Sequence, residues 1–244
     1  MGIVRIKGVV LKIANSSEND KVLTVLTAER GKIRVFCKGA KKIKSAFLSS
    51  TEFLSFSDFM LYEGNGDLYN LNSAESINVF YNLRMDIEKL MVASTMAQIM
   101  NDVCQEEELS YKRLQLFLNT LYVLSETDKN LELVFAIFRI RLLAILGFVP
   151  RLNKCVGCDK EVSEMKEIYF SIKDNGIKCD ICKRQDKGAI ELSKTAYTSM
   201  VYILASDAKK IFSFDVPESV IRELSLVVGV YTTEKLEKEY KVGI

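Results

Sequence analysis

Val22-Leu-Thr-Val-Leu-Thr-Ala-Glu-Arg-Gly-Lys-Ile-Arg-Val-Phe-Cys37 is the stretch that decides the fold of the N-terminal part of this chain. Its centre, residues 29–32, is typical of a hairpin turn, because Gly31 can take the positive φ that such a turn needs. After the turn, apolar and mostly basic side chains alternate: Ile33, Val35 and Cys37 against Lys32, Arg34 and Phe36. The stretch predicts two antiparallel strands with one buried face and one mostly basic face.

Strand-like segments continue on both sides of this hairpin. β-Branched residues dominate 3–14, apolar and aromatic residues fill 52–62, and a last apolar segment covers 68–74. Polar turns at 15–20 and 63–67 separate these segments from their neighbours, and a basic irregular loop spans 39–50. Five strands within about 75 residues, joined by such turns, predict a small barrel.

Near residue 81 the apolar period changes from that of a strand to that of a helix. Helices are predicted from Tyr81 to about Val103, over Tyr111–Ser125, over Leu131–Leu146, from a Ser193 cap to about Ala205, and from Pro217 to about Tyr240. The third is apolar almost all round, so we expect it to be the central helix. The change of period predicts an α+β chain with two domains, 1–79 and 80–244.

Four of the six cysteines form two pairs, Cys155-Val-Gly-Cys158 and Cys179-Asp-Ile-Cys182, with twenty residues between the pairs. Two residues between cysteines let one tight turn present two sulfurs to one ion, and zinc takes four thiolates tetrahedrally. The spacing therefore predicts one structural Zn2+ held by Cys155, Cys158, Cys179 and Cys182, in a finger inserted at about 151–187. The alternatives are four unrelated buried cysteines or a redox pair; two copies in turn-like contexts disfavour the redox pair. Cys37 and Cys104 are predicted to be core residues.

Positive charge is concentrated in residues 1–44, which hold eleven lysines and arginines against three acids, whereas the rest of the chain holds 23 against 29. Such asymmetry favours a face that binds polyanions. The predicted nucleic-acid-binding residues are Arg30, Lys32, Arg34, Lys38, Lys41, Lys42 and Lys44, a run without an acid. The alternative is a solvated charged strand and loop. Because Phe36 is the single aromatic residue in the run, we expect mainly electrostatic binding.

Several classes of function are disfavoured by what the sequence lacks. There is no histidine, the usual general base, and there is no GxxxxGK[ST], GxGxxG or GxSxG motif. We therefore expect no enzymatic activity, and a nuclease or other metal enzyme is a distant alternative. The longest stretches without charge have twelve residues, too few to span a membrane, and no secretory signal follows Met1. We expect a cytoplasmic protein with no membrane partner.

Several short motifs, in order along nearly the whole chain, resemble those of the bacterial RecO family of DNA repair and recombination mediator proteins. The motifs are Gly8–Leu11, Leu26–Lys32, Lys38–Lys42 with Ser45, Tyr62–Leu68, and Phe138–Leu143 with Gly147–Pro150, followed by the four cysteines. Three features depart from the pattern. Arg139 stands where the family usually has Glu, which puts a local ion pair in doubt, and Gly176 is single where Gly-Gly is common. The C-terminus, Glu237–Ile244, lacks the family's usual polar ending.

The resemblance implies an N-terminal OB-fold and a helical C-terminal domain with a zinc finger. It implies binding to single- and double-stranded DNA, strand annealing, and loading of the RecA recombinase together with RecR. It also implies contact with the acidic, hydrophobic C-terminal tail of single-strand-binding protein, and a cytoplasmic, nucleoid-associated location. The alternative is an OB-fold zinc protein that binds RNA or acts in transcription.

Overall fold

The computed structural model describes residues 2–42, 45–64 and 68–242. The chain folds into two compact units: the first runs to Glu126 and also takes in Val242, and the second is Thr127–Lys241. Among the described residues, the first unit holds five strands and two α-helices, and the second holds three α-helices and a small sheet. In the described part of the chain, no helix is both long and apolar enough to cross a membrane.

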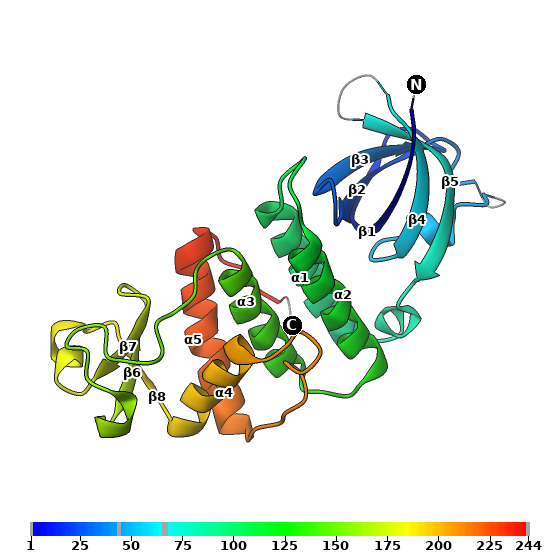
Figure 1. The fold of residues 1–244 in the computed structure, drawn as a ribbon. Coiled ribbons are helices and arrows are strands. Elements are labelled where there is room, and N and C mark those ends of the chain that lie inside the picture. The colour runs from blue at the N-terminus through cyan, green and yellow to red at the C-terminus, as the bar shows by residue number, and fades with distance from the viewer. Residues whose placement is uncertain (1, 43–44, 65–67, 243–244) are drawn as a thin grey trace. The chain divides into compact units, whose positions relative to one another are not determined.

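The first unit begins with a closed, OB-like barrel, as the sequence predicts (Figure 1). Its strands are β1 (Ile3–Asn15), β2 (Lys21–Thr27), β3 (Lys32–Cys37), β4 (Phe56–Tyr62) and β5 (Leu68–Asn78). They close in the order β1-β2-β3-β5-β4, and β3 and β5 pair in parallel. The alternating residues Ile33, Val35 and Cys37 all point into the core, which confirms the predicted inner face.

The predicted strand 52–62 begins later than expected. Ser49–Thr51 form a short 3-10 helix, and Leu54 takes a left-handed φ of 65°, which an extended strand cannot accommodate. β4 therefore starts at Phe56, whereas β5 runs four residues past its predicted end at Ala74.

Two helices, α1 (Ile87–Val103) and α2 (Tyr111–Glu126), complete this unit. The predicted start at Tyr81 is wrong, because residues 81–84 form a separate 3-10 turn and Asp86 caps α1. The Asp86 carboxylate accepts hydrogen bonds at 3.0 Å from the N–H groups of Glu88 and Lys89, which satisfies two donors of the first turn.

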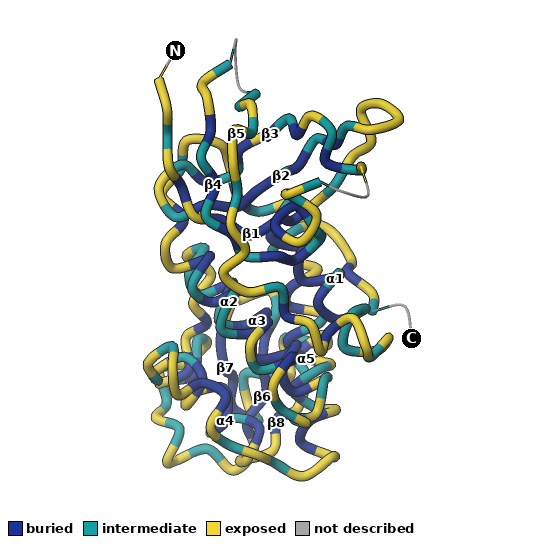
Figure 2. The backbone as a smooth tube through the Cα atoms, turned by 90° about the vertical axis from the view of Figure 1, so that its right-hand side faces the viewer, coloured by how far each residue is buried: buried dark blue, intermediate teal, exposed yellow. Residues whose placement is uncertain are grey.

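The second unit contains α3 (Leu131–Ile145), α4 (Lys194–Ala205) and α5 (Glu218–Leu236). Most of α3 is buried, as expected of a central helix (Figure 2). Ser193 caps α4 as predicted, through a hydrogen bond of 3.1 Å from Ala196 N–H. The predicted end of the last helix near Tyr240 is wrong: Glu237 takes a left-handed φ of 52°, which ends α5 at Leu236.

A three-stranded sheet lies in the segment between α3 and α4. It consists of β6 (Ile168–Ser171), β7 (Gly176–Cys179) and β8 (Ile190–Leu192), in the order β7-β6-β8. The antiparallel hairpin of β6 and β7 occupies the twenty-residue interval between the two cysteine pairs. It brings the second pair back toward the first.

Candidate metal centre and nucleic-acid face

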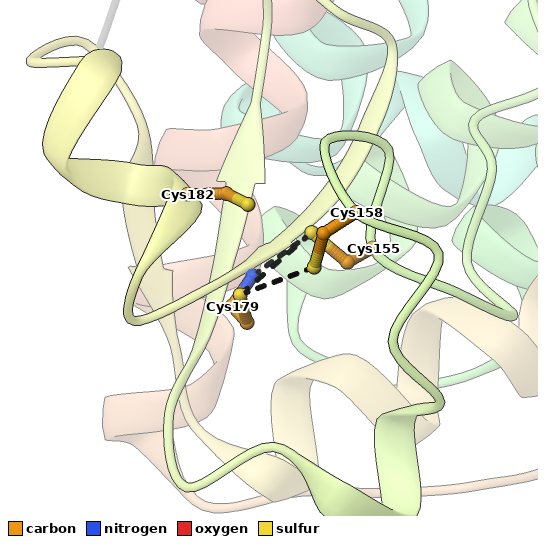
Figure 3. A group of neighbouring side chains, drawn as sticks. All are labelled: Cys155, Cys158, Cys179 and Cys182. Carbon is orange, nitrogen blue, oxygen red and sulfur yellow. Dashed lines mark hydrogen bonds between the residues drawn. The ribbon is translucent and has the colours of Figure 1, made fainter.

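The four predicted metal ligands converge on one point (Figure 3). Their sulfur atoms all lie within 4.8 Å of one another. Cys179 Sγ lies 3.9 Å from Cys155 Sγ and 3.8 Å from Cys158 Sγ. Zn–S bonds of about 2.3 Å in a tetrahedron place the sulfurs about 3.8 Å apart. These cysteines could therefore hold one zinc ion.

The loop of the first pair is shaped to bring its two sulfurs together. Cys155 N–H donates to Lys160 C=O at 2.9 Å, and Asp159 N–H donates to Cys155 C=O at 3.0 Å. A Cβ on Gly157 would lie 2.9 Å from Cys182 Sγ and 3.0 Å from Cys182 Cβ. Any larger residue there would force the loop to shift as the second pair approaches the first.

Backbone donors surround the Cys155 sulfur. The N–H groups of Gly157 and Cys179 each lie 3.4 Å from it. Burial raises the pKa of the Cys155 thiol, but backbone hydrogen bonds, chiefly from Cys179, outweigh burial and bring that pKa to about 7. Burial raises the pKa of Cys182 to about 12. A bound cation would favour the thiolate at both positions, because metal binding displaces thiol protons.

A buried ion network lies next to the cysteines, and nothing in the sequence pattern indicated it. Lys178, 7% exposed, places Nζ 3.0 Å from Asp186 Oδ2 and also pairs with Asp174. Ser171 Oγ donates to the same Asp186 oxygen at 2.5 Å. The Ser171 hydroxyl and then the Lys178 ammonium lower the pKa of Asp186. The network joins β6 and β7 to the segment that follows the second cysteine pair.

Among the predicted nucleic-acid-binding residues, Arg30 and Lys32 have partners within the protein. Arg30 Nη1 donates to Tyr69 Oη at 2.5 Å, and Lys32 Nζ donates to Asn101 C=O at 2.6 Å, in the last turn of α1. Backbone hydrogen bonds also join this hairpin to the α1–α2 loop, such as that from Lys32 N–H to Gln105 C=O at 3.0 Å.

The surroundings of Arg30 and Lys32 are also not uniformly basic. Both line a cavity of about 360 Å3 together with three carboxylates, those of Glu29, Glu106 and Glu107. The cavity is therefore a mixed-charge site, which the run of basic residues in the sequence did not indicate.

The loop after β3 holds the next group of predicted residues. Lys38 and Lys42 are exposed, whereas Lys41 is half-buried and donates through Nζ to Ser17 C=O at 2.6 Å. Asp20 holds this loop by accepting from Gly39 N–H at 2.7 Å, a bond that lowers the pKa of its carboxyl. Lys44 lies outside the described residues. An acid distant in sequence thus lies against the basic loop.

Arg34 is exposed in the middle of β3, and strand pairing gives it a basic neighbour that sequence reasoning missed. The register places Lys12 of β1 opposite Thr24 of β2, and Thr24 opposite Arg34. Directly paired residues point to the same face of a sheet, so exposed Lys12 and Arg34 share the outer face of the barrel. Half-buried Phe36 lies two residues from Arg34 on that face. We name Lys12, Arg34 and Phe36 the outer row.

Comparison with known proteins matches the N-terminal and the C-terminal parts of the chain to two models of one family. A family model described as "Recombination protein O N terminal" matches residues 1–80, and one described as "Recombination protein O C terminal" matches residues 84–242. A DNA repair protein RecO from Acetivibrio thermocellus is 39% identical, over 98% of this chain and 94% of the relative. A DNA repair protein RecO from Clostridium perfringens is 30% identical, over 94% of this chain and 91% of the relative.

Proposed function

This chain belongs to the RecO family of DNA repair proteins, and on that premise we propose that it binds and anneals DNA without catalysis and helps load the recombinase RecA onto single strands. Membership in the family gives the chain a role in DNA repair and recombination. The two family models together cover almost all of the chain, which confirms the resemblance based on short motifs.

The outer row is the observation that best supports DNA binding. Lys12 and Arg34 are exposed on one face of a closed barrel, and half-buried Phe36 presents part of an aromatic ring beside them. Basic side chains attract the phosphates of both single- and double-stranded DNA. An aromatic side chain gives an unpaired base a surface to stack on. We propose that single strands cross this face and that Lys38, Lys41 and Lys42 extend the contact. Lys44 remains a candidate, and Arg30 and Lys32 are secondary ones because of their internal partners.

We assign the metal as one structural Zn2+ per chain, bound by Cys155, Cys158, Cys179 and Cys182. Four thiolates fill a tetrahedral shell and leave no open position for water, so the ion would hold the fold and would not activate a reactant. The spacing and the sulfur–sulfur distances both support this assignment.

We also propose a division of labour along the chain. Residues 1–79 bind nucleic acid, since every predicted DNA-binding residue falls within them. Residues 80–244, with the zinc finger at about 151–187, would serve protein partners, RecR and the C-terminal tail of single-strand-binding protein. Both partners would be met in the cytoplasm, at the nucleoid. A pull-down of both proteins with purified chain tests this part of the proposal.

Salt dependence of single-strand binding tests the DNA face. Log affinity should fall with log salt by roughly 0.7 per contacted phosphate, so Lys38, Lys41 and Lys42 changed together to Glu should reduce the slope by about two. Changing Lys12 and Arg34 to Glu should reduce it by about 1.4 on the same scale. Lys209 and Lys210, exposed in the other unit, make a charge-matched control pair.

If the slope of log affinity against log salt is unchanged in both Glu variants, this face is not part of the binding site. Annealing of two complementary DNA oligonucleotides, without ATP, tests the activity itself. Failure to anneal DNA, with tight binding to RNA alone, would favour the alternative of an RNA-binding zinc protein.

A further inference from the structure

Arg139 of α3 is a buried arginine with few hydrogen-bond partners. The residue is only 8% exposed, and its Nε has no hydrogen-bond partner. Its guanidinium lies 4.2 Å from the centroid of the Phe135 ring, and Nη2 makes one long hydrogen bond, 3.4 Å, to Ser225 C=O. Burial lowers the pKa of Arg139 to about 10, so the group is still charged at neutral pH. A buried cation with so few acceptors is costly, and an oxyanion ligand would lower that cost.

The arginine forms the floor of a cavity of about 440 Å3, bounded by α3, α5 and the segment after α5. Ser225 lines the same cavity, and its hydroxyl is a second buried polar group without a hydrogen-bond partner. Gly229 keeps the floor open, because a Cβ there would lie 3.2 Å from Arg139 Nη1. Two residues that line one cavity therefore each carry a buried polar atom without a hydrogen-bond partner.

The walls and rim of the cavity differ from its floor. Leu226 and Val230 of α5 are 57% and 42% exposed and supply aliphatic surface. Glu234 and Glu239, both exposed, lie at the rim. Aliphatic walls favour a ligand with a hydrocarbon body.

We propose that this cavity is a binding site for a monocarboxylate with an aliphatic body. On binding, the two side chains would shift so that one carboxylate oxygen accepts from Arg139 Nε–H and the other from the Ser225 hydroxyl, while the hydrocarbon part lies against Leu226 and Val230. Arginine suits this task because its planar donors match a carboxylate. The inference is independent of DNA binding, since all of its residues lie in the second unit.

The probe for the test is 4-methylpentanoate, and the readout is the Nε–H resonance of Arg139 in protein labelled with 15N-arginine. The expected result is a saturable shift of that resonance with 4-methylpentanoate and none with the neutral 4-methylpentanamide. Inorganic phosphate, which lacks the hydrocarbon body, should bind more weakly. An unchanged resonance, an equal response to the amide, or a response to phosphate alone would each overturn the proposal.

Three variants give a second readout, the rise in melting temperature with 4-methylpentanoate. Arg139→Met should keep or raise the melting temperature without ligand, because it removes an unpaired buried charge, and should abolish the ligand-dependent rise. Leu226→Ser, at an exposed position, should weaken binding roughly tenfold through lost apolar contact and leave acetate binding unchanged.

The matched control is Arg141→Gln, two residues along the same helix. Arg141 Nη1 already donates to Ile203 C=O at 3.0 Å and Leu204 C=O at 2.6 Å, so its loss should lower the melting temperature but leave the ligand-dependent rise intact. A full ligand-dependent rise in Arg139→Met, or its loss in Arg141→Gln alone, would contradict the assignment.

Discussion

The barrel and the β7-β6-β8 sheet are both small sheets that carry candidate functional side chains, but they are held together by different means. The barrel closes on itself, leaves no unpaired edge, and encloses a continuous apolar core that includes Leu23, Val25, Phe59 and Leu61. The sheet is open, and its strands have only four, four and three residues. So small a sheet cannot bury enough apolar surface on its own. We propose that a metal ion at its cysteine cluster supplies what the core does not.

Removal of the metal should produce the largest difference in stability between the small sheet and the barrel. Structural zinc contributes about 10–16 kcal/mol of binding free energy at pH 7 in zinc-finger peptides, and that energy is folding energy. Chelation, or Cys179→Ser, should therefore expose the amides of β6 and β7 to hydrogen exchange while β1–β5 stay protected. Elemental analysis should find about one zinc per chain before chelation.

Cys104→Ala is the matched control for that experiment. Cys104 is fully buried but lies outside the cysteine cluster, so its loss should leave the zinc content unchanged. Equal protection of β6 and β7 with and without chelator would mean that the sheet does not depend on metal.

Truncation of a core side chain in the barrel should have the next largest effect. It should destabilise the barrel and leave the small sheet unaffected. Phe59 is fully buried, so Phe59→Ala should reduce the free energy of unfolding by about 3–5 kcal/mol, with zinc content unchanged. Urea unfolding provides the measurement. Phe36→Ala, on the outer face, should cost much less stability and should instead weaken single-strand binding. Similar losses of stability in the two variants would contradict the assigned inner and outer faces.

Overpacking of the cysteine loop should have a smaller effect. The added Cβ in Gly157→Ala would meet Cys182 at 2.9–3.0 Å, so the loop must shift, at a cost of about 1–3 kcal/mol. Competition with a chromophoric chelator should show the cost as weaker zinc binding. Gly188→Ala is the control, because the nearest atom to a Cβ there, Asp186 Oδ1, lies at 3.7 Å. Equal zinc affinity in the two variants would argue against the close approach at Gly157.

The smallest expected effect is an acid transition at Asp20, confined to the barrel. The hydrogen bond from Gly39 N–H lowers the pKa of Asp20 in the folded protein. Its contribution to stability is therefore complete above the unfolded value near 3.9 and is lost as the pH falls through the lower folded value. A carboxyl-carbon NMR titration should place the Asp20 midpoint below that of an unfolded reference. A midpoint at or above the reference would contradict the bond, and Asp20→Asn should loosen the 38–42 loop.

Local patterns were sufficient wherever a structural feature depends on residues close in sequence. Alternation along 33–37 predicted which side chains enter the core, because strand side chains point to opposite faces in turn. The two C-x2-C pairs predicted the sulfur cluster, because each tight turn presents its own two sulfurs. Helix limits were less predictable: Glu237 ends α5 by its left-handed conformation, and its residue type does not signal that.

The sequence by itself determined the barrel strands, the positions of most helices, the cysteine cluster and the excess of positive charge in the first 44 residues. Tertiary structure alone decided which of those basic side chains are exposed and which have partners within the protein. Lys12 joins Arg34 through the register of three strands, and Lys32 is directed to a carbonyl of α1 by the fold of the first unit. It also left Arg139 buried beside a cavity. The reason is physical: periodicity sets which face a side chain takes, whereas its partners come from segments far away in the chain.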